Sequence, residues 1–138
     1  MRHVFFEASK PRKFSFDAVT WRWSSYGASM NHLPQQIRFC KSRDGTRIAY
    51  AICGTGPVVM WVQHWVHNLE LDWENPIWRP WLNWLTKRFT VVRYDWRGCG
   101  LSDRDQINFS LDNYVADLEA VVQATEIERF ALFGMAGM

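Results

Sequence analysis

The sequence predicts an α/β fold in which a mostly parallel sheet is covered by helices on both faces. Three observations predict it. Apolar runs of strand length, such as Val58–Val62, alternate along the chain with segments of helical periodicity. These runs are continuously apolar, which is typical of strands buried on both faces. The resulting order of strand, helix, strand, helix and strand favours right-handed crossovers between neighbouring parallel strands.

A hairpin and a central strand are expected first. Gln36–Cys40 and Arg47–Cys53 flank a segment, Arg43–Thr46, that contains Asp-Gly. Asp-Gly between two strand candidates is a strong hairpin signal, because both residues tolerate positive φ. Gly54–Pro57 then breaks the chain before Val58–Val62, so this run is expected to be a separate strand in the middle of the sheet.

Two amphipathic helices and two strands complete the pattern. The first helix follows Pro76, and its apolar positions are Trp78, Trp81, Leu82 and Leu85. Phe89–Tyr94 is the next buried-strand candidate. Ser110 is a suitable N-cap for the second helix. The expected sheet-facing stripe of that helix is Leu111, Tyr114, Val115, Leu118, Val121 and Val122. Arg129–Phe133 is the last strand, and we expect it to be an unpaired edge.

Length and composition exclude several classes of protein and of function. The chain has 138 residues, enough for one domain, and its 48% hydrophobic and 22% charged residues exclude disorder. A net charge of +2 argues against nucleic-acid binding, and no apolar run reaches the length of about 20 residues that a spanning helix needs. Three widely spaced cysteines, Cys40, Cys53 and Cys99, favour a reducing compartment, so we expect a cytoplasmic protein.

The first 29 residues differ from the rest. They mix basic and aromatic residues in no helical or strand period, and Lys10–Lys13 interrupts any apolar run of a signal peptide. We expect residues 1–29 to be an irregular extension, either an upstream mistranslation or a loose native segment, and residues 30–138 to be a partial domain. A basic aromatic arm that docks on a membrane or a partner is the alternative.

The segment Tyr94–Asp103, Y-D-W-R-G-C-G-L-S-D, resembles the Y-D-x-R-G-x-G-x-S segment of α/β-hydrolase-fold proteins. Phe130–Met138 stands where that family has its nucleophile elbow, G-x-S-x-G. The resemblance covers residues 36–138 and implies the N-terminal portion of the fold, truncated at the elbow. Together with Leu71–Glu74, the segment is similar to bacterial α/β-hydrolase domains found alone or fused to adenylate cyclases and LuxR-type regulators.

The resemblance implies hydrolysis of an ester or a related small molecule, with no cofactor. It assigns the nucleophile position to Ala136, whose methyl group cannot attack a carbonyl. The backbone N–H groups of Trp65 and Gly137 take the positions of the oxyanion hole. The acid and the histidine of the triad follow the elbow in chain order, beyond Met138. We therefore expect this chain to lack hydrolase activity.

Other polar residues of the motif are expected to be structural. We expect Asp95 and Arg97 to brace a turn, and Ser102 to be a turn or cap residue because it has no adjacent base. The full set of structural motif residues is Asp95, Arg97, Gly98, Gly100, Ser102 and Gly134. His64 and His67 are not expected to hold a metal, since structural zinc usually recruits four defined ligands.

Three hypotheses remain open from sequence. The chain is a piece of a hydrolase, with a missing C-terminal half as its partner. Alternatively, it is a non-catalytic domain that senses a small-molecule ligand and is joined to a cyclase or regulator output domain. A third possibility is that the isolated chain does not fold stably, because half a sheet buries too little apolar surface to offset backbone ordering of about 1 to 2 kcal/mol per residue.

Overall fold

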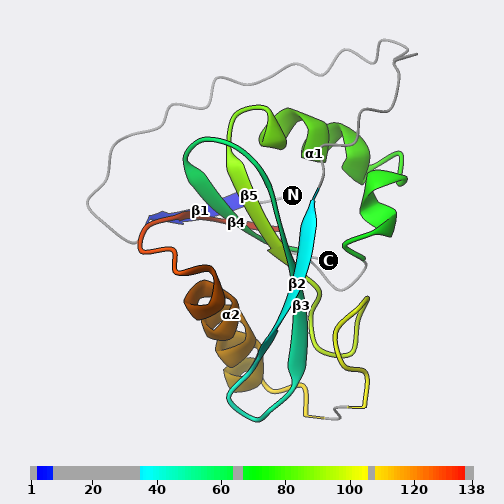
Figure 1. The fold of residues 1–138 in the computed structure, drawn as a ribbon, viewed down its shortest axis with the longest axis vertical. Coiled ribbons are helices and arrows are strands. Elements are labelled where there is room, and N and C mark those ends of the chain that lie inside the picture. The colour runs from blue at the N-terminus through cyan, green and yellow to red at the C-terminus, as the bar shows by residue number, and fades with distance from the viewer. Residues whose placement is uncertain (1–2, 8–34, 64–66, 106–107, 136–138) are drawn as a thin grey trace.

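The computed structural model describes residues 3–7, 35–63, 67–105 and 108–135. Five strands and three helical segments follow one another after an N-terminal strand (Figure 1). In chain order they are β1 (His3–Glu7), β2 (Gln36–Lys41), β3 (Arg47–Gly54), β4 (Val58–Val62), the 3-10 helix η1 (Leu71–Trp73), α1 (Trp78–Thr86), β5 (Thr90–Tyr94), α2 (Leu111–Thr125) and β6 (Ala131–Met135).

The six strands form one sheet in the order β1-β6-β4-β5-β3-β2. The pairs β4/β5 and β4/β6 are parallel, whereas β2/β3, β3/β5 and β1/β6 are antiparallel. Four strands, β2, β4, β5 and β6, therefore run in the same direction. The chain moves from β4 to β5 on one side and then returns past β4 to β6, so the predicted α/β fold is confirmed.

Side-chain alternation in the central strands creates two separate cores. Val59 and Trp61 of β4 pack on the face covered by α1, in a cluster with Leu82 and Leu85. Met60, between them, packs on the opposite face, in the cluster that contains Val121 and other residues of α2. Figure 1 shows α1 and α2 on opposite sides of the sheet. Both faces of β4 are therefore buried, as its continuous apolar run predicts.

Aromatic side chains fill the core beneath α1. The rings of Trp61 and Phe133 lie 5.6 Å apart between centroids, and Trp78 meets Trp61 edge-on at 6.2 Å. Trp81 stacks on Phe133 at 6.4 Å. These contacts place α1 over both β4 and β6, so the last strand is covered on this face by the tryptophans of the first long helix.

The N-terminus of α2 is as predicted, and Leu118, Val121 and Val122 of the expected stripe pack against the sheet. The Oγ atom of Ser110 accepts a hydrogen bond from the backbone N–H of Asn113 at 3.3 Å, as an N-cap does. Leu111 and Val115, expected to face the sheet, are 76% and 46% exposed. Asp117 is buried instead. Its ion pair with an arginine beneath the helix, described below, turns this polar position inward and the two apolar positions outward.

The N-terminal strand corrects two expectations. His3–Glu7 lies within the segment predicted to be irregular, yet it pairs antiparallel with β6 along five residue pairs. The outer edge of β6 is therefore paired. An edge strand can pair with any extended segment through its free N–H and C=O groups. The strand was not predicted because five residues are too few to show a strand period. The domain boundary at residue 30 stays a prediction.

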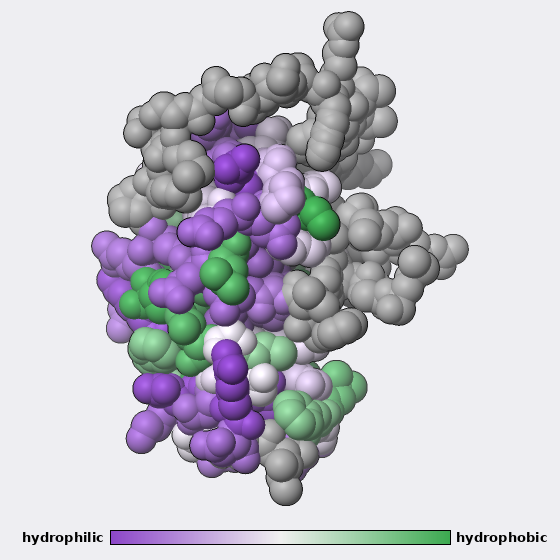
Figure 2. Space-filling view, turned by 90° about the vertical axis from the view of Figure 1, so that its right-hand side faces the viewer, coloured by the Kyte–Doolittle hydropathy of each residue, from purple (hydrophilic) through white to green (hydrophobic). Residues whose placement is uncertain are grey.

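The described helices are all too short or too polar to cross a membrane. Figure 2 shows the face that carries η1, α1 and the loop after β5, where hydrophobic residues form small separate patches among hydrophilic ones. Two exposed apolar side chains of this region are Leu71 and Ile77, at 61% and 64% exposure. Leu71 is the first residue of η1, and Ile77 directly precedes α1.

Candidate functional site

The carboxyl ends of the three parallel strands lie side by side. Val62 of β4 pairs in register with Gly134 of β6, and β5 borders β4 on its other side. Ligands of doubly wound sheets bind at this edge, where the connections diverge to opposite faces. The expected oxyanion-hole and nucleophile residues Trp65, Gly137 and Ala136 follow these strand ends in sequence, but they lie outside the described residues.

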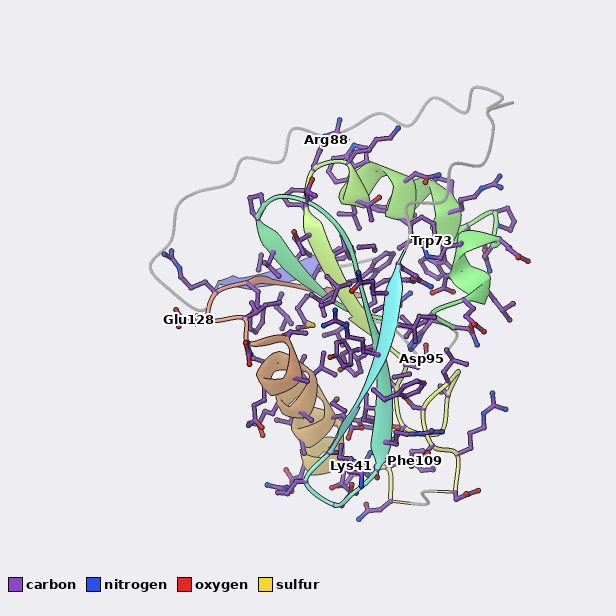
Figure 3. The ribbon with its side chains drawn as sticks, viewed as in Figure 1. Lys41, Trp73, Arg88, Asp95, Phe109 and Glu128 are labelled. Atoms are coloured by element: carbon purple, nitrogen blue, oxygen red, sulfur yellow. The ribbon has the colours of Figure 1, made fainter. Side chains whose placement is uncertain are left out.

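Asp95, directly after β5, joins the loops at this edge (Figure 3). It is fully buried. Its Oδ1 accepts the backbone N–H of Leu69 at 3.0 Å, and its Oδ2 accepts that of Leu101 at 2.8 Å. Burial raises the pKa of this carboxyl, while the two N–H donors oppose that rise. The contacts connect the loop before η1 to the loop after β5.

Gly100 and Ser102 fit closely around Asp95. Gly100 has φ of +50°, and a Cβ atom there would collide with the Asp95 carboxylate. The Ser102 hydroxyl donates to the Asp95 backbone C=O at 2.6 Å and accepts the N–H of Ala49 at 2.9 Å. The hydroxyl is thus held between β3 and the loop after β5, which is the geometry of a turn residue and not of an activated nucleophile.

Arg97 points away from this edge and joins three segments. Its guanidinium donates to both carboxylate oxygens of Asp117, at 2.8 and 2.7 Å, and to Oδ2 of Asp44 at 2.7 Å. The side chains of Arg97 and Asp117 are both fully buried. The adjacent Gly98 has φ of +80° and donates its N–H to the Asp103 C=O at 2.8 Å. Arg97 therefore fixes α2 and the β2–β3 turn to the loop after β5.

Stability should fall in acid partly because of Asp44. The hydrogen bond from Arg97 holds the pKa of the Asp44 carboxyl well below its ordinary value of 3.8. Because the unfolded chain binds this proton more readily, the stabilisation is present above the ordinary value and is lost as pH falls below it. Urea unfolding midpoints measured from about pH 5 to pH 2 should fall more steeply for the native chain than for Asp44→Asn. Equal slopes would contradict this assignment.

A second buried ion pair lies nearer the edge and was not predicted from the sequence. Arg93 of β5 donates to Oδ2 of Asp72 at 2.9 Å and to the Oε1 of Gln35 at 2.8 Å. Burial lowers the pKa of Arg93, and Asp72 opposes this shift. Gln63, just after β4, also donates to Oδ2 of Asp72 at 2.9 Å. The only sequence signal was a charged residue within an otherwise apolar strand.

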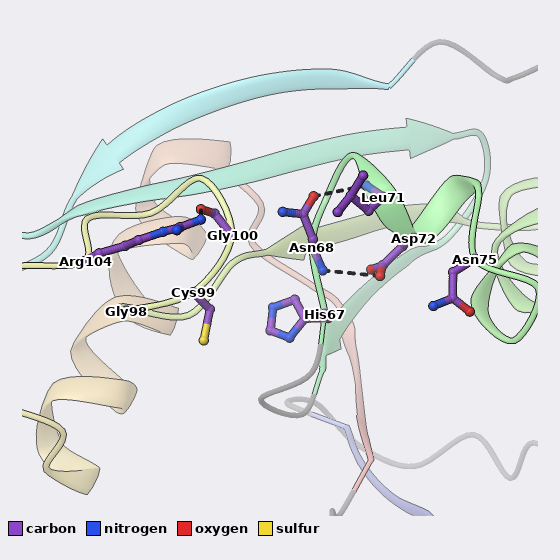
Figure 4. Close-up of a pocket in the computed structure, with 9 residues that line it drawn as sticks. All are labelled: His67, Asn68, Leu71, Asp72, Asn75, Gly98, Cys99, Gly100 and Arg104. Carbon is purple, nitrogen blue, oxygen red and sulfur yellow. Dashed lines mark hydrogen bonds between the residues drawn. The ribbon is translucent and has the colours of Figure 1, made fainter.

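A pocket of about 450 Å³ opens between the loop before α1 and the loop after β5 (Figure 4). It is lined by His67, Asn68, Leu71, Asp72, Asn75, Gly98, Cys99, Gly100 and Arg104. Two of the structural motif residues, Gly98 and Gly100, form one wall. The volume is within the range of small-molecule sites, about 300 to 1,000 Å³.

His67 forms the floor of this pocket. It is buried, and its Nε2 lies 3.1 Å from the Tyr94 C=O and 3.6 Å from Oδ1 of Asp95. The ring also contacts Trp96 edge-on at 6.2 Å between centroids. Within the described part of the chain, no group of three His, Cys, Asp or Glu side chains is placed to hold a metal ion. His67 is held here by the end of β5.

A doubly wound α/β domain with a buried aspartate directly after β5, followed by two closely spaced glycines, belongs to the class of folds that carry chemistry on the loops after their strands. The comparison with known families specifies it further. Residues 57–135 match the model of the alpha/beta hydrolase fold, which is more than half of the chain. The chain belongs to the α/β-hydrolase family.

Individual relatives agree with this assignment. An α/β hydrolase from Sphaerobacter thermophilus is 31% identical, with a TM-score of 0.58, over 72% of this chain and 35% of that one. The esterase RhEst1 from Rhodococcus is 26% identical, with a TM-score of 0.55, over 66% and 32%. A non-heme chloroperoxidase from Streptomyces lividans is 31% identical over 61% and 29%. The chain thus spans about a third of the length of these relatives.

Proposed function

We propose that this chain carries the α/β-hydrolase scaffold without an ester-cleaving nucleophile. The observation that carries the proposal is Ala136, which stands at the serine position of Gly134-Met135-Ala136-Gly137-Met138. A methyl group can neither attack a carbonyl nor be activated by a base. Met138 also stands where the family motif ends in glycine.

Two side chains near the strand ends, Ser102 and Cys99, are poorly suited to replace the nucleophile. The Ser102 hydroxyl is engaged by two backbone groups, as shown above. Burial raises the pKa of the Cys99 thiol, and the nearby Asp95 carboxylate raises it further. A thiol with a raised pKa is protonated at neutral pH, whereas the thiolate is the nucleophilic form. Both facts support a scaffold that binds without forming an acyl-enzyme.

The test is hydrolysis of p-nitrophenyl acetate and butyrate by the purified chain, with Ala136→Ser alongside. Circular dichroism verifies that both proteins are folded. The native chain is expected to release p-nitrophenol at the buffer rate, because the methyl group of Ala136 cannot form an acyl-enzyme. Saturable turnover by the native chain would overturn the proposal. Turnover by Ala136→Ser alone would show that the missing hydroxyl was the sole deficiency.

A second candidate is a non-catalytic domain that senses a small molecule. The pocket in Figure 4 favours it, because its described lining offers polar side chains and a volume of about 450 Å³ at the sheet edge where ligands of such folds bind. In this function the pocket would be retained while the nucleophile is lost, and the output would come from a fused cyclase or regulator domain. Ligand binding without turnover is its test, for which the chemistry of the ligand must first be identified.

The proposed partner is therefore a small molecule and not a nucleic acid or a membrane. The net charge of +2 is too small to attract a polyanion strongly. Cys40, Cys53 and Cys99 are all free thiols. Free thiols are typical of reducing compartments, which supports the cytoplasm as the proposed location. The proposed chemistry needs no cofactor.

A further inference from the structure

We propose that the pocket between the loop before α1 and the loop after β5 binds a small organic acid by its carboxylate, with Asn68, Asn75 and Arg104 as hydrogen-bond donors. This inference rests on the ligand-sensing candidate function and names the chemistry of its ligand. It does not depend on Ala136 or on any catalytic step.

The two asparagines present donors because their oxygens are already engaged. Oδ1 of Asn68 accepts the backbone N–H groups of Glu70 and Leu71, at 2.9 and 3.0 Å. Oδ1 of Asn75 accepts the N–H of Ile77 at 2.8 Å. Each side chain must therefore turn its NH₂ group the other way. In Figure 4 the amide nitrogen of Asn68 points toward the loop that carries Gly98 and Gly100, and that of Asn75 points toward the side on which His67 lies.

Arg104 adds a positive charge to the facing wall, on the loop after β5. Its Nη2 donates to the Gly100 C=O at 2.8 Å, which holds the guanidinium beside the pocket. A guanidinium has five N–H donors, and this bond uses one of them. The remaining donors suit the two oxygens of a carboxylate, which arginine can bind in a bidentate manner.

The acidic residue in the pocket wall does not oppose an anion strongly. Oδ2 of Asp72 accepts from Arg93 and Gln63, and its Oδ1 accepts the backbone N–H of Asn68 at 3.2 Å. Its charge is compensated by the buried Arg93 guanidinium. Among the described lining side chains, donors therefore outnumber accessible acceptors, which favours an acceptor ligand over a cation.

The rest of the lining suits an apolar body. Leu71 is 61% exposed at the pocket mouth, and the protonated Cys99 thiol and the Gly98 backbone form the opposite wall. A thiol in this state behaves as a small hydrophobic group. A carboxylate attached to a short alkyl or aryl group matches both parts of the surface.

The test is calorimetric titration of the full chain with sodium hexanoate and, separately, with hexanamide. These ligands have the same alkyl chain and differ in charge. Hexanoate is expected to bind at least about tenfold more tightly, because charge-assisted hydrogen bonds are the stronger ones. Arg104→Gln should weaken hexanoate binding about tenfold and change hexanamide binding less than about twofold. Arg129→Gln, the same change in the exposed segment before β6, is the control and should leave both affinities unchanged.

A second variant keeps the test decisive if Arg104→Gln is poorly folded. Asn75→Asp retains the oxygen that accepts the Ile77 N–H, but it replaces the donor with a negative acceptor, so hexanoate binding should be lost. Asn108→Asp makes the same change where Oδ1 accepts the Ser110 N–H, outside the pocket, and should leave binding intact.

Equal affinities for hexanoate and hexanamide, or hexanoate binding unaffected by Asn75→Asp, would overturn the inference. Absence of saturable hexanoate binding by folded protein would also overturn it. The ester assay measures turnover alone, so its outcome is independent of these results.

Discussion

Replacing Arg97 with alanine is expected to lower the free energy of unfolding by about 3 to 5 kcal/mol. The change removes the partner of Asp117, whose carboxylate is fully buried and accepts two hydrogen bonds from this arginine. An uncompensated buried charge is more costly than the intact pair is stabilising. The measurement is urea unfolding followed by tryptophan fluorescence.

Two comparisons make this prediction specific. Arg47→Ala breaks the pair with Asp103, whose side chains are 56% and 33% exposed, and should cost less than about 1 kcal/mol. The double replacement Arg97→Met with Asp117→Leu removes both buried charges and should recover part of the loss. A similar small cost for Arg97→Ala and Arg47→Ala would show that the buried pair does not hold α2 in place.

Gly100→Ala is expected to destabilise the chain by about 3 kcal/mol and to disturb the loops around the pocket. Its φ of +50° is already unfavourable for alanine, and the new methyl group would occupy the space of the Asp95 carboxylate. Asp95 would then have to release the backbone N–H of Leu69 or of Leu101. Unfolding in urea measures the cost, and the amide resonances of these two residues report the displacement.

Gly45→Ala is the matched control. Gly45 has φ of +89°, but a Cβ atom there would meet nothing within 4 Å. Only backbone strain of about 1 to 2 kcal/mol is expected, without any change near Asp95. If the two substitutions cost the same, the contact between Gly100 and Asp95 would not be a determinant of stability.

Local patterns predicted most of the fold because they reflect local physics. The continuous run Val58–Val62 is β4 residue for residue, and Ser110 caps α2 as predicted. The exposure of Leu111 and Val115 and the burial of Asp117 could not be predicted from apolar spacing, because Asp117 pairs with Arg97, which lies 20 positions earlier in the chain. β1 was missed because its pairing with β6 depends on an edge at the other end of the chain.

The candidate site was predicted only in part, for a similar reason. The glycines and the aspartate of the segment after β5 stand out in the sequence because their turn chemistry is local. The Arg93–Asp72 pair and the orientation of Asn75 depend on which loops meet at the sheet edge. Contacts between these loops follow from the topology of the sheet and not from the spacing of residues along any one segment. The pocket could therefore not be predicted from the sequence.

The position of Asp95 also limits how this chain can change in length. The Asp95 carboxylate accepts the N–H of Leu101, six positions later, and the Asp95 backbone C=O accepts the hydroxyl of Ser102, seven positions later. The Asp95 N–H donates to the C=O of Ala49 in β3. An insertion or deletion between Asp95 and Ser102 would separate partners that depend on an exact count of residues. The number of residues between Asp95 and Ser102 is therefore as constrained as their identities, and we expect insertions and deletions to be tolerated only outside this segment.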